Sequence, residues 1–256
     1  MRTYTVRSVQ IGEGMPKICV PIVDTSAEAI IARAHGLDKE KIDVVEWRVD
    51  HYEGADDAAS VLQVLHELRD ALGDTVLLFT FRTKGEGGER WITPEDYETL
   101  LLGAACSKDA DLIDVEILAG DVSTRRIMDG IHGAGAGVLA SSHDFTQTPD
   151  KKEMIRRLQK MQQMGADLLK LAVMPQNVGD VLTLLELTDE MHRLYAKRPL
   201  ITISMGPLGV VSRMCGETFG SAMTFAAAGE CSAPGQLQVD QMRQVLQILH
   251  DSIHRE

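Results

Sequence analysis

Eight short, continuous apolar runs recur along the whole chain of 256 residues, and this pattern constrains the fold more than any other feature. Each run is rich in β-branched residues and continuous rather than alternating, which is typical of a strand buried on both faces of a parallel sheet. The runs begin about 22 to 37 residues apart, the length of a strand plus a crossover helix. They span residues 17–23, 44–50, 75–82, 112–117, 137–145, 166–175, 199–206 and 221–228.

Helical patterns lie between the runs. Ser26 is a candidate N-cap for the first of them, and Thr148 for a later one that has Pro149 at its first helical position. The clearest patterns span residues 26–37, 148–165 and 239–256.

Eight strands that alternate with helices over about 250 residues predict an α/β fold, a (β/α)₈ TIM barrel. The alternative is an open doubly wound sheet, which usually carries a glycine-rich phosphate-binding turn after its first strand. Here the first run is followed by DTSAEA, and the chain has no G-x-G-x-x-G or Walker motif. Residues 3–14 indicate a short N-terminal β-hairpin. Because no linker, repeat or low-complexity tract interrupts the pattern, we expect residues 1–256 to form a single barrel domain.

The chain is acidic, with 26 Lys and Arg against 38 Asp and Glu and a net charge of −12. Sequence-independent binding to nucleic acid depends on cationic surface, so we expect no nucleic-acid partner. No apolar run approaches the roughly 18–20 residues that span a bilayer, and the N-terminus lacks the apolar core of a signal peptide. We therefore expect a cytoplasmic protein with no membrane partner. The four cysteines form no C-x-x-C pair and are predicted to be free thiols.

Polar residues that interrupt the late part of a run are the candidate site, because barrel enzymes place their chemistry at the carboxyl ends of the strands. In the second run Glu46, Arg48 and Asp50 occupy alternate positions, which puts their side chains on one face. Buried together, they must pair with one another or bind a ligand. The third run ends in Arg82, and the glycine-rich loop TKGEGGE that follows contains Glu86. A solvated surface loop is the alternative interpretation of that loop.

Two further runs carry the residues with the strongest chemical implication. His143 lies at the end of the fifth run, in SSHDF, and is the best general acid–base candidate among the eight histidines. Lys170 lies inside the otherwise apolar run ADLLKLAVMP. Apolar surroundings favour a neutral amine, which can attack a ketone or aldehyde and form a Schiff base. A lysine whose ammonium reaches solvent at a strand end is the alternative.

Late in the chain, Arg213 falls in an apolar segment that we expect to be a loop, GVVSRMCGE. Ser232 and Gln236 are the polar residues of CSAPGQLQ, residues 231–238, whose small residues, Pro and Gly suit a lid. With the arginines of the second and third runs, Arg213 makes three at one end of the predicted barrel. Three arginines suit a small-molecule substrate that carries a carboxylate and several hydroxyls.

We expect no metal site, because the chain has no H-E-x-x-H motif, no Asp-rich calcium loop and no zinc-type Cys/His spacing. The remaining histidines are interpreted as solvated or structural. They are His35, His51, His66, His132, His192, His250 and His254.

Five motifs in this order resemble those of type I 3-dehydroquinate dehydratases of the shikimate pathway: EWRVDHYEG, LLFTFRTKGEGGE, SSHDF, LLKLAVMPQ and SAPGQ. The match covers nearly the whole chain, from KICVPI to the last helix. The resemblance implies a (β/α)₈ barrel, usually a homodimer, that needs no metal or organic cofactor. It implies a hydro-lyase that converts 3-dehydroquinate to 3-dehydroshikimate through a covalent imine.

The resemblance also implies a role for each candidate residue. Lys170 corresponds to the Schiff-base lysine, His143 to the proton-transfer histidine and Glu86 to the carboxylate that partners this histidine. The positions that match substrate-binding residues are Glu46, Arg48, Arg82, Arg213, Ser232 and Gln236. The chain departs from the pattern at Pro21, where some members have Ser, and at Ser142, in place of the Asn of the common SNHDF.

Two other functions remain open from the residues alone. One is another imine-forming lyase on the same barrel, such as a class I aldolase, which would use Lys170 but cleave a carbon–carbon bond. The other is a non-catalytic binding barrel, which would hold the same ligand without a covalent bond.

Overall fold

The protein is described by a computed structural model that covers residues 2–117, 121–229 and 235–255. Within them, eight parallel strands form one sheet in the order β10-β3-β4-β5-β6-β7-β8-β9. The sheet curls until its ends meet, where Leu200 and Ser221 form a parallel bridge and Ala222 N donates to Leu200 O at 2.7 Å. The predicted barrel and its eight strands are confirmed. The strands are β3 Lys17–Ile22, β4 Val44–Arg48, β5 Val76–Thr80, β6 Leu112–Glu116, β7 Gly137–Asp144, β8 Leu168–Val173, β9 Leu200–Ser204 and β10 Met223–Phe225.

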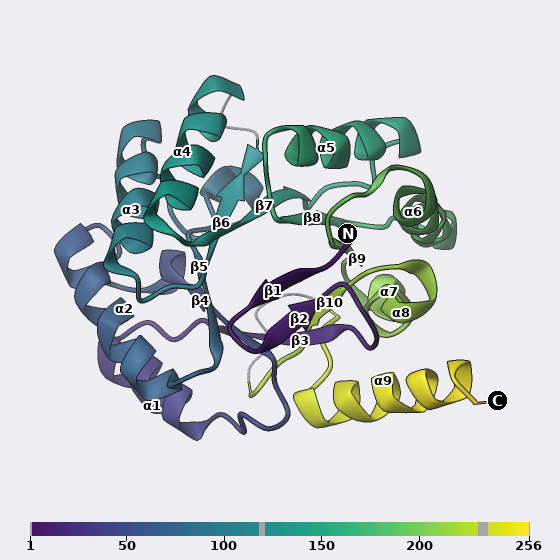
Figure 1. The fold of residues 1–256 in the computed structure, drawn as a ribbon, viewed down its shortest axis with the longest axis horizontal. Helices are drawn as coiled ribbons and strands as arrows, with labels where there is room; N and C mark the ends of the chain where they lie inside the picture. The colour runs from purple at the N-terminus through teal and green to yellow at the C-terminus, as the bar shows by residue number, and fades with distance from the viewer. Residues whose placement is uncertain (1, 118–120, 230–234, 256) are drawn as a thin grey trace.

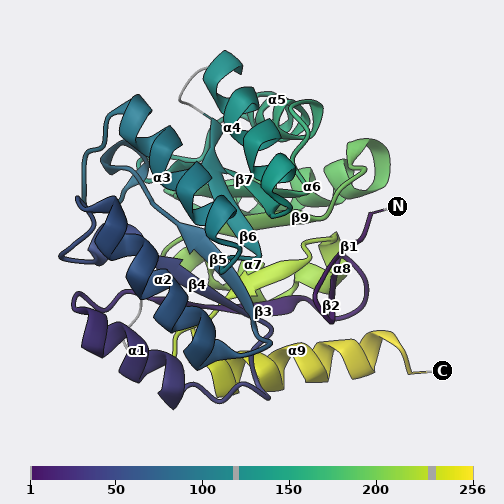
Figure 2. The same cartoon turned by 60° about the vertical axis from the view of Figure 1, so that its left-hand side comes forward.

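Helices surround the barrel (Figures 1 and 2). The α-helices are α1 Ala27–Gly36, α2 Ala58–Leu72, α3 Pro94–Ser107, α4 Asp121–Ala134, α5 Lys151–Gln163, α6 Val178–Glu190, α7 Val210–Met214, α8 Gly216–Phe219 and α9 Val239–Ile253. Short 3₁₀ turns follow β4, β5 and β9 at Val49–His51, Lys84–Glu86 and Pro207–Gly209, and a π-turn, Met191–Tyr195, follows α6. None of the helices in the described residues has the length and apolar character that crossing a bilayer requires.

One predicted helix start is right and one is wrong. Ser26 caps α1, because its hydroxyl accepts from Ala29 N. Helix α5 begins three residues after the predicted cap Thr148, and Asp150 caps it by accepting from Glu153 N at 3.0 Å. The hydroxyl of Thr148 instead donates to the carbonyl oxygen of Met174. The reason is that an Asp one residue beyond Pro149 offers a carboxylate cap at a position where the backbone is already extended.

The predicted N-terminal hairpin is confirmed as β1, Tyr4–Val6, and β2, Val9–Ile11, which pair antiparallel. Val6 and Ile11 are buried in the same interior cluster as Val44 and Val76, which begin β4 and β5. The hairpin therefore covers the end of the barrel at which the strands begin, across which it lies in Figure 1. The opposite end is left for a pocket.

Alternation along the strands decides which side chains enter the barrel. In β8, Leu169 and Leu171 pack in the layer beneath the helices, whereas Leu168 and Ala172 belong to the interior cluster. Lys170 lies between these two interior positions and shares their face. Interior positions near the strand starts are apolar, whereas those toward the strand ends include charged side chains such as Lys170 beside apolar ones such as Ala172 and Ile203. The candidate chemistry is therefore confined to one end.

Candidate active site

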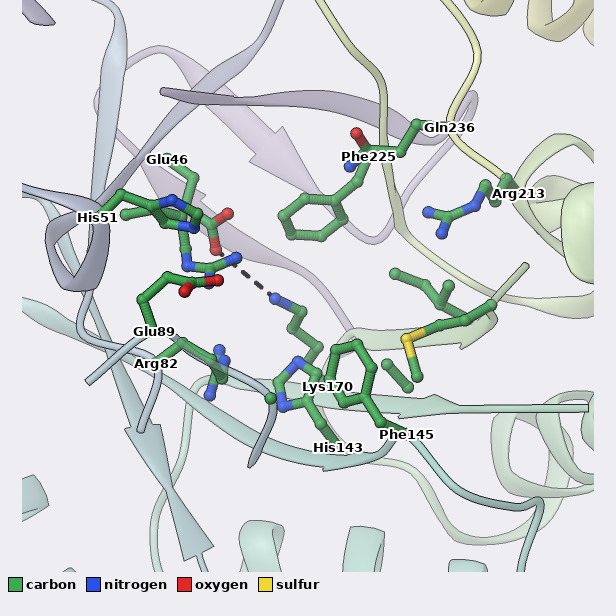
Figure 3. Close-up of a pocket in the computed structure, with 15 residues that line it drawn as sticks. Glu46, His51, Arg82, Glu89, His143, Phe145, Lys170, Arg213, Phe225 and Gln236 are labelled. Carbon is green, nitrogen blue, oxygen red and sulfur yellow. Dashed lines mark ion pairs between the residues drawn. The ribbon is translucent and has the colours of Figure 1, made fainter. Parts of the chain in front are cut away.

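A pocket opens at the carboxyl ends of the strands (Figure 3). Its empty space, including open solvent at the mouth, is about 680 Å³, which is in the range of small-molecule sites. Seven of the nine predicted site residues line it: Glu46, Arg48, Arg82, His143, Lys170, Arg213 and Gln236. Eight residues that the sequence did not single out complete the lining: His51, Gly87, Glu89, Phe145, Ala172, Ile203, Met205 and Phe225.

The Lys170 side chain points into this pocket and is 5% exposed, so it does not reach out to solvent as the alternative interpretation required. Its surroundings are not apolar, and that expectation is wrong. Nζ lies 3.6 Å from Glu46 Oε1 and 3.9 Å from Asp114 Oδ2, and 4.2 Å above the centre of the Phe225 ring. The physical reason is that the interior face of each neighbouring strand also becomes polar near its end, which the sequence of one strand cannot reveal.

His143 and Glu86 form a buried pair beside the lysine. The ring atom Nδ1 lies 2.8 Å from Glu86 Oε2, and the backbone N–H of His143 donates to the same oxygen at 3.1 Å. Burial lowers the pKa of His143 well below its usual value, and the positive charges of Arg82, Lys170 and Arg48 lower it further. The imidazole is therefore neutral at neutral pH and able to accept a proton.

Glu86 lies behind His143 rather than in the pocket lining, at 3% exposure. Burial raises the pKa of Glu86 well above its usual value, as does the negative charge of Glu116, whereas Arg82 opposes this shift. A carboxyl group fixed to Nδ1 holds the imidazole ring in one orientation. Positioning the histidine is therefore what this residue can do.

The glycine-rich loop buries Glu86 because its backbone packs tightly on the strand end. Gly88 N donates to Thr83 O at 2.9 Å, and a Cβ atom at Gly88 would lie 1.9 Å from the carbonyl oxygen of Arg82. Only glycine permits that approach. The alternative of a fully solvated surface loop is wrong for Glu86.

Arg82 is held by a set of acidic residues that sequence reasoning missed. Its NH1 donates to Glu116 at 2.8 Å and to Ser141 at 2.9 Å, and its NH2 donates to Asp114 at 2.7 Å. Three of the five guanidinium N–H groups therefore have partners inside the protein. The missed signal was present in LIDVEI, where Asp114 and Glu116 alternate as Glu46 and Arg48 do in the second run.

Asp114→Ala is expected to lower the free energy of unfolding by about 3 kcal/mol, since it leaves the buried Arg82 with one carboxylate fewer and Ser141 without its acceptor. Urea denaturation followed by circular dichroism measures this change. Asp129→Ala is the control, because Asp129 is exposed on α4 and should change stability by less than about 0.5 kcal/mol. Equal effects of the two substitutions would contradict the structural role of Asp114.

Glu46 and Arg48 are close to the lysine but have different partners. Thr80 donates its hydroxyl to Glu46 Oε1 at 3.0 Å. Arg48 donates two hydrogen bonds to Asp50, from Nε to Oδ1 at 2.8 Å and from NH2 to Oδ2 at 2.7 Å. The predicted pairing among the charged residues of this run is thus confirmed for Arg48 and Asp50.

Arg213 and Gln236 lie on the side of the pocket opposite Glu46 and His51, as Figure 3 shows. Arg213 is 2% exposed and lies on the short helix α7, so the expectation of a loop at this position is wrong. Ser232 and most of the lid predicted at residues 231–238 lie outside the described residues. A small molecule in this pocket would meet Arg213 and Gln236 on one side and a mixed set of charges, including Glu46, Glu89 and Arg82, on the other, with the amine and the imidazole between them.

Fold and site together define a (β/α)₈-barrel enzyme whose pocket combines a buried lysine with a histidine–glutamate pair. The model of the type I 3-dehydroquinase family matches residues 18–253. A 3-dehydroquinate dehydratase of Clostridioides difficile is 48% identical over 253 residues, 99% of each chain. That of Bacillus subtilis is 46% identical over 250 residues, 98% of each chain. The chain belongs to the type I 3-dehydroquinase family, and the resemblance carried by the motifs is confirmed.

The crystal structure of a relative has the same fold as this chain. The crystal structure of type I 3-dehydroquinate dehydratase from Clostridium difficile with covalently modified comenic acid superimposes with a TM-score of 0.95. The two chains are 48% identical, over 98% of this chain and 99% of that one. The barrel described above is therefore the fold of that enzyme.

Proposed function

We propose that this enzyme dehydrates 3-dehydroquinate to 3-dehydroshikimate through an imine on Lys170, with His143 as the general acid and base. One observation carries the proposal: the lysine amine and the imidazole are presented side by side, from adjacent strands, in one largely buried pocket. Family membership supports the overall reaction, and the covalently modified ligand of the Clostridium difficile relative is consistent with covalent chemistry.

The reaction begins when the Lys170 amine adds to the substrate ketone. The adduct loses the ketone oxygen as water and leaves a protonated imine, which is an electron sink for the neighbouring carbon. His143 then removes the α-proton, and the electron pair moves into the imine to form an enamine. The enamine returns its electrons and expels the β-hydroxyl, which leaves as water after His143 gives its proton back. Hydrolysis of the conjugated imine releases the product and restores the amine, so the net change is the loss of one water.

Glu86 positions His143 and stabilises the imidazolium that forms during the two proton transfers, as the acid of a catalytic triad does. Because the pKa of His143 is lowered, the histidine starts neutral and is ready to act as the base. It then returns the proton readily, since its protonated form is disfavoured in the buried site.

The remaining residues of the pocket are proposed to hold the substrate. Arg213 binds the carboxylate from one side, with Gln236 beside it. Glu46, Arg48 and the free N–H groups of Arg82 bind hydroxyls from the other side. Ser232 belongs to this proposal through its motif alone.

Borohydride trapping tests the imine. We expect the protein incubated with 3-dehydroquinate and borohydride to gain one stable adduct, and peptide mapping to place it on Lys170. Turnover without a trappable adduct would contradict the imine. A class I aldolase would also be trapped, but its products lack the conjugated enone carboxylate that absorbs in the ultraviolet. A non-catalytic binding barrel would yield neither adduct nor product.

We further propose that the protein is a cytoplasmic homodimer, on the basis of the family resemblance. Size-exclusion chromatography with light scattering should give twice the chain mass of 28.1 kDa. A single-chain mass over the working concentration range would contradict the dimer.

A further inference from the structure

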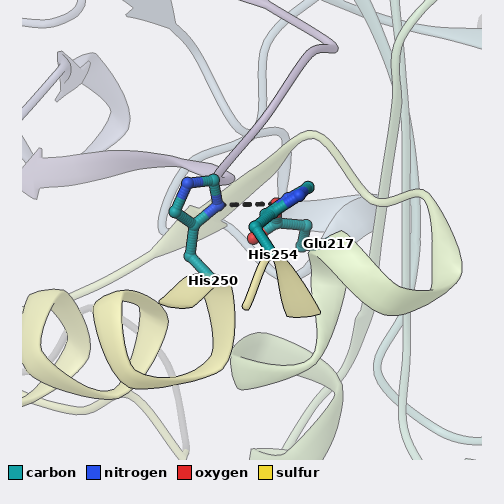
Figure 4. Close-up of side chains that lie close together, drawn as sticks. All are labelled: Glu217, His250 and His254. Carbon is teal, nitrogen blue, oxygen red and sulfur yellow. Dashed lines mark hydrogen bonds and ion pairs between the residues drawn. The ribbon is translucent and has the colours of Figure 1, made fainter. Parts of the chain in front are cut away.

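A second group of chemically active side chains lies away from the pocket, where the last helix ends against α8 (Figure 4). Glu217 lies on α8, shortly before β10 begins, and His250 and His254 lie on and just after the last turn of α9. Glu217 therefore lies toward the end of the barrel at which β10 starts, whereas the pocket is at the carboxyl ends. None of these three residues lines the pocket.

The two imidazoles converge on one carboxylate oxygen. His250 Nδ1 lies 2.8 Å and His254 Nε2 lies 3.0 Å from Glu217 Oε1. The two histidines are four residues apart and so share a helix face, which is the spacing of paired histidine ligands in zinc motifs. One candidate ligand atom from each residue lies within 4.8 Å of the other two.

These separations are close to those of an occupied zinc site. Bonds of about 2.0–2.2 Å place the ligand atoms of a tetrahedral zinc ion about 3.3 Å apart. The His254 side chain is 58% exposed, so its ring can rotate to open the cluster around an ion. The carboxylate and the His250 ring, which are 11% and 32% exposed, already form the fixed side of such a site.

The surroundings of the Glu217 carboxylate also favour a bound cation. Its Oε2 atom is buried and has no hydrogen-bond partner in the described part of the chain. No lysine or arginine in the described residues forms an ion pair with it, and its ion-pair partners there are the two histidines. A buried carboxylate needs compensation by charge or by hydrogen bonds, and a divalent cation between it and the two rings would supply it.

We propose that Glu217, His250 and His254 bind one divalent transition-metal ion, best represented by Zn²⁺. Two imidazoles and one carboxylate are ligands that Zn²⁺ accepts readily, and they leave a fourth position for water. The ion fastens the end of α9 to α8. The buried side chains of α9, Val239, Met242 and Leu246, all lie in its first eight residues. The ion would therefore hold the second half of the helix, which these buried side chains do not anchor.

A metal ion at this cluster departs both from the expectation of no metal site and from the interpretation of the two histidines as solvated or structural. The spacing His-x-x-x-His lies in the sequence, but the third ligand comes from a residue 33 positions before His250, and only the fold brings it close. The inference is independent of the reaction proposed for the pocket, and its test uses no measurement of turnover.

Zn²⁺ titration of the full chain by calorimetry, after removal of metals with a chelator and dialysis, tests the site. We expect one Zn²⁺ per chain in the wild-type protein. His254→Gln and Glu217→Gln should each weaken the binding at least tenfold. His35→Gln is the matched control, because it removes an exposed histidine on α1 and should leave the affinity unchanged. The exposed position of His254 keeps the test usable even where Glu217→Gln disturbs folding.

The midpoint temperature of thermal unfolding is a second measurement of Zn²⁺ binding. Zn²⁺ should raise the midpoint of the wild-type and His35→Gln proteins by more than that of the two cluster variants at the same Zn²⁺ concentration, since an ion that binds only the folded chain stabilises it in proportion to its affinity. Absence of stoichiometric binding in the wild-type protein would overturn the proposal. So would equal affinity of the wild-type protein and both cluster variants, because the ion would then be held elsewhere.

Discussion

Lys170→Ala is expected to reduce kcat/KM for dehydration of 3-dehydroquinate by about 10⁴–10⁶-fold, the scale of loss when a covalent nucleophile is removed. Without the amine no imine forms, and the α-proton must be removed from an unactivated ketone. A general base alone accounts for only about 10²–10⁴-fold of catalysis, so His143 cannot replace this contribution. Initial-rate measurements of the ultraviolet-absorbing product quantify the loss.

The design of this experiment follows from the surroundings of the lysine. Removing the amine leaves Glu46 and Asp114 close together without their shared cation, which reduces stability as well as activity. Lys170→Met is therefore measured alongside, since it retains most of the side-chain volume. Circular dichroism checks that both variants are folded. Lys84→Ala, an exposed lysine on the loop before Glu86, is the control and should stay within about threefold of wild type. Turnover by a folded Lys170 variant within tenfold of the wild-type rate would contradict the imine mechanism.

The barrel was predictable because each strand is buried on both faces, and a strand of this kind needs a continuous run of apolar residues. The polar residues that break these runs, such as Lys170 and His143, were predictable for the same reason. An interior position that is not apolar must have a partner or a function. The boundary error at α5 has a different origin, since both Thr148 and Asp150 are good caps and only the path of the chain after β7 decides between them.

Contacts between side chains of different strands were much harder to predict from the sequence. Nothing within LLKLAV indicates that Lys170 faces Asp114 from β6, two strands away in the sheet, because the curvature of the sheet creates that contact. The same limit concealed the carboxylates around Arg82 and the approach of Glu217 to His250. Sequence periodicity reports which face a side chain occupies, whereas the identity of its neighbours across the barrel depends on register and curvature.

His143→Ala is expected to slow turnover by about 10²–10⁴-fold and to change which species accumulates. The lysine can still condense with the ketone, but proton removal, departure of the hydroxyl and hydrolysis of the imine all lose their proton carrier. A covalent adduct should therefore build up and be visible in the intact mass of the protein without borohydride. His66→Ala, which removes an exposed histidine on α2, is the control and should show no adduct above wild type.

The pH profile separates a catalytic His143 from a merely structural one. Burial and three neighbouring cations lower the pKa of His143, so the base form persists to a pH below the ordinary histidine midpoint of about 6.5. The kcat/KM of the wild-type protein should therefore hold through neutral pH and fall only on the acid side of that midpoint. In His143→Ala this acid limb should disappear along with most of the rate. A folded His143→Ala protein that keeps the acid limb and shows no adduct would assign the proton transfers to another group, with Glu46, His51 and Glu89 as the other histidine and carboxylate side chains that line the pocket.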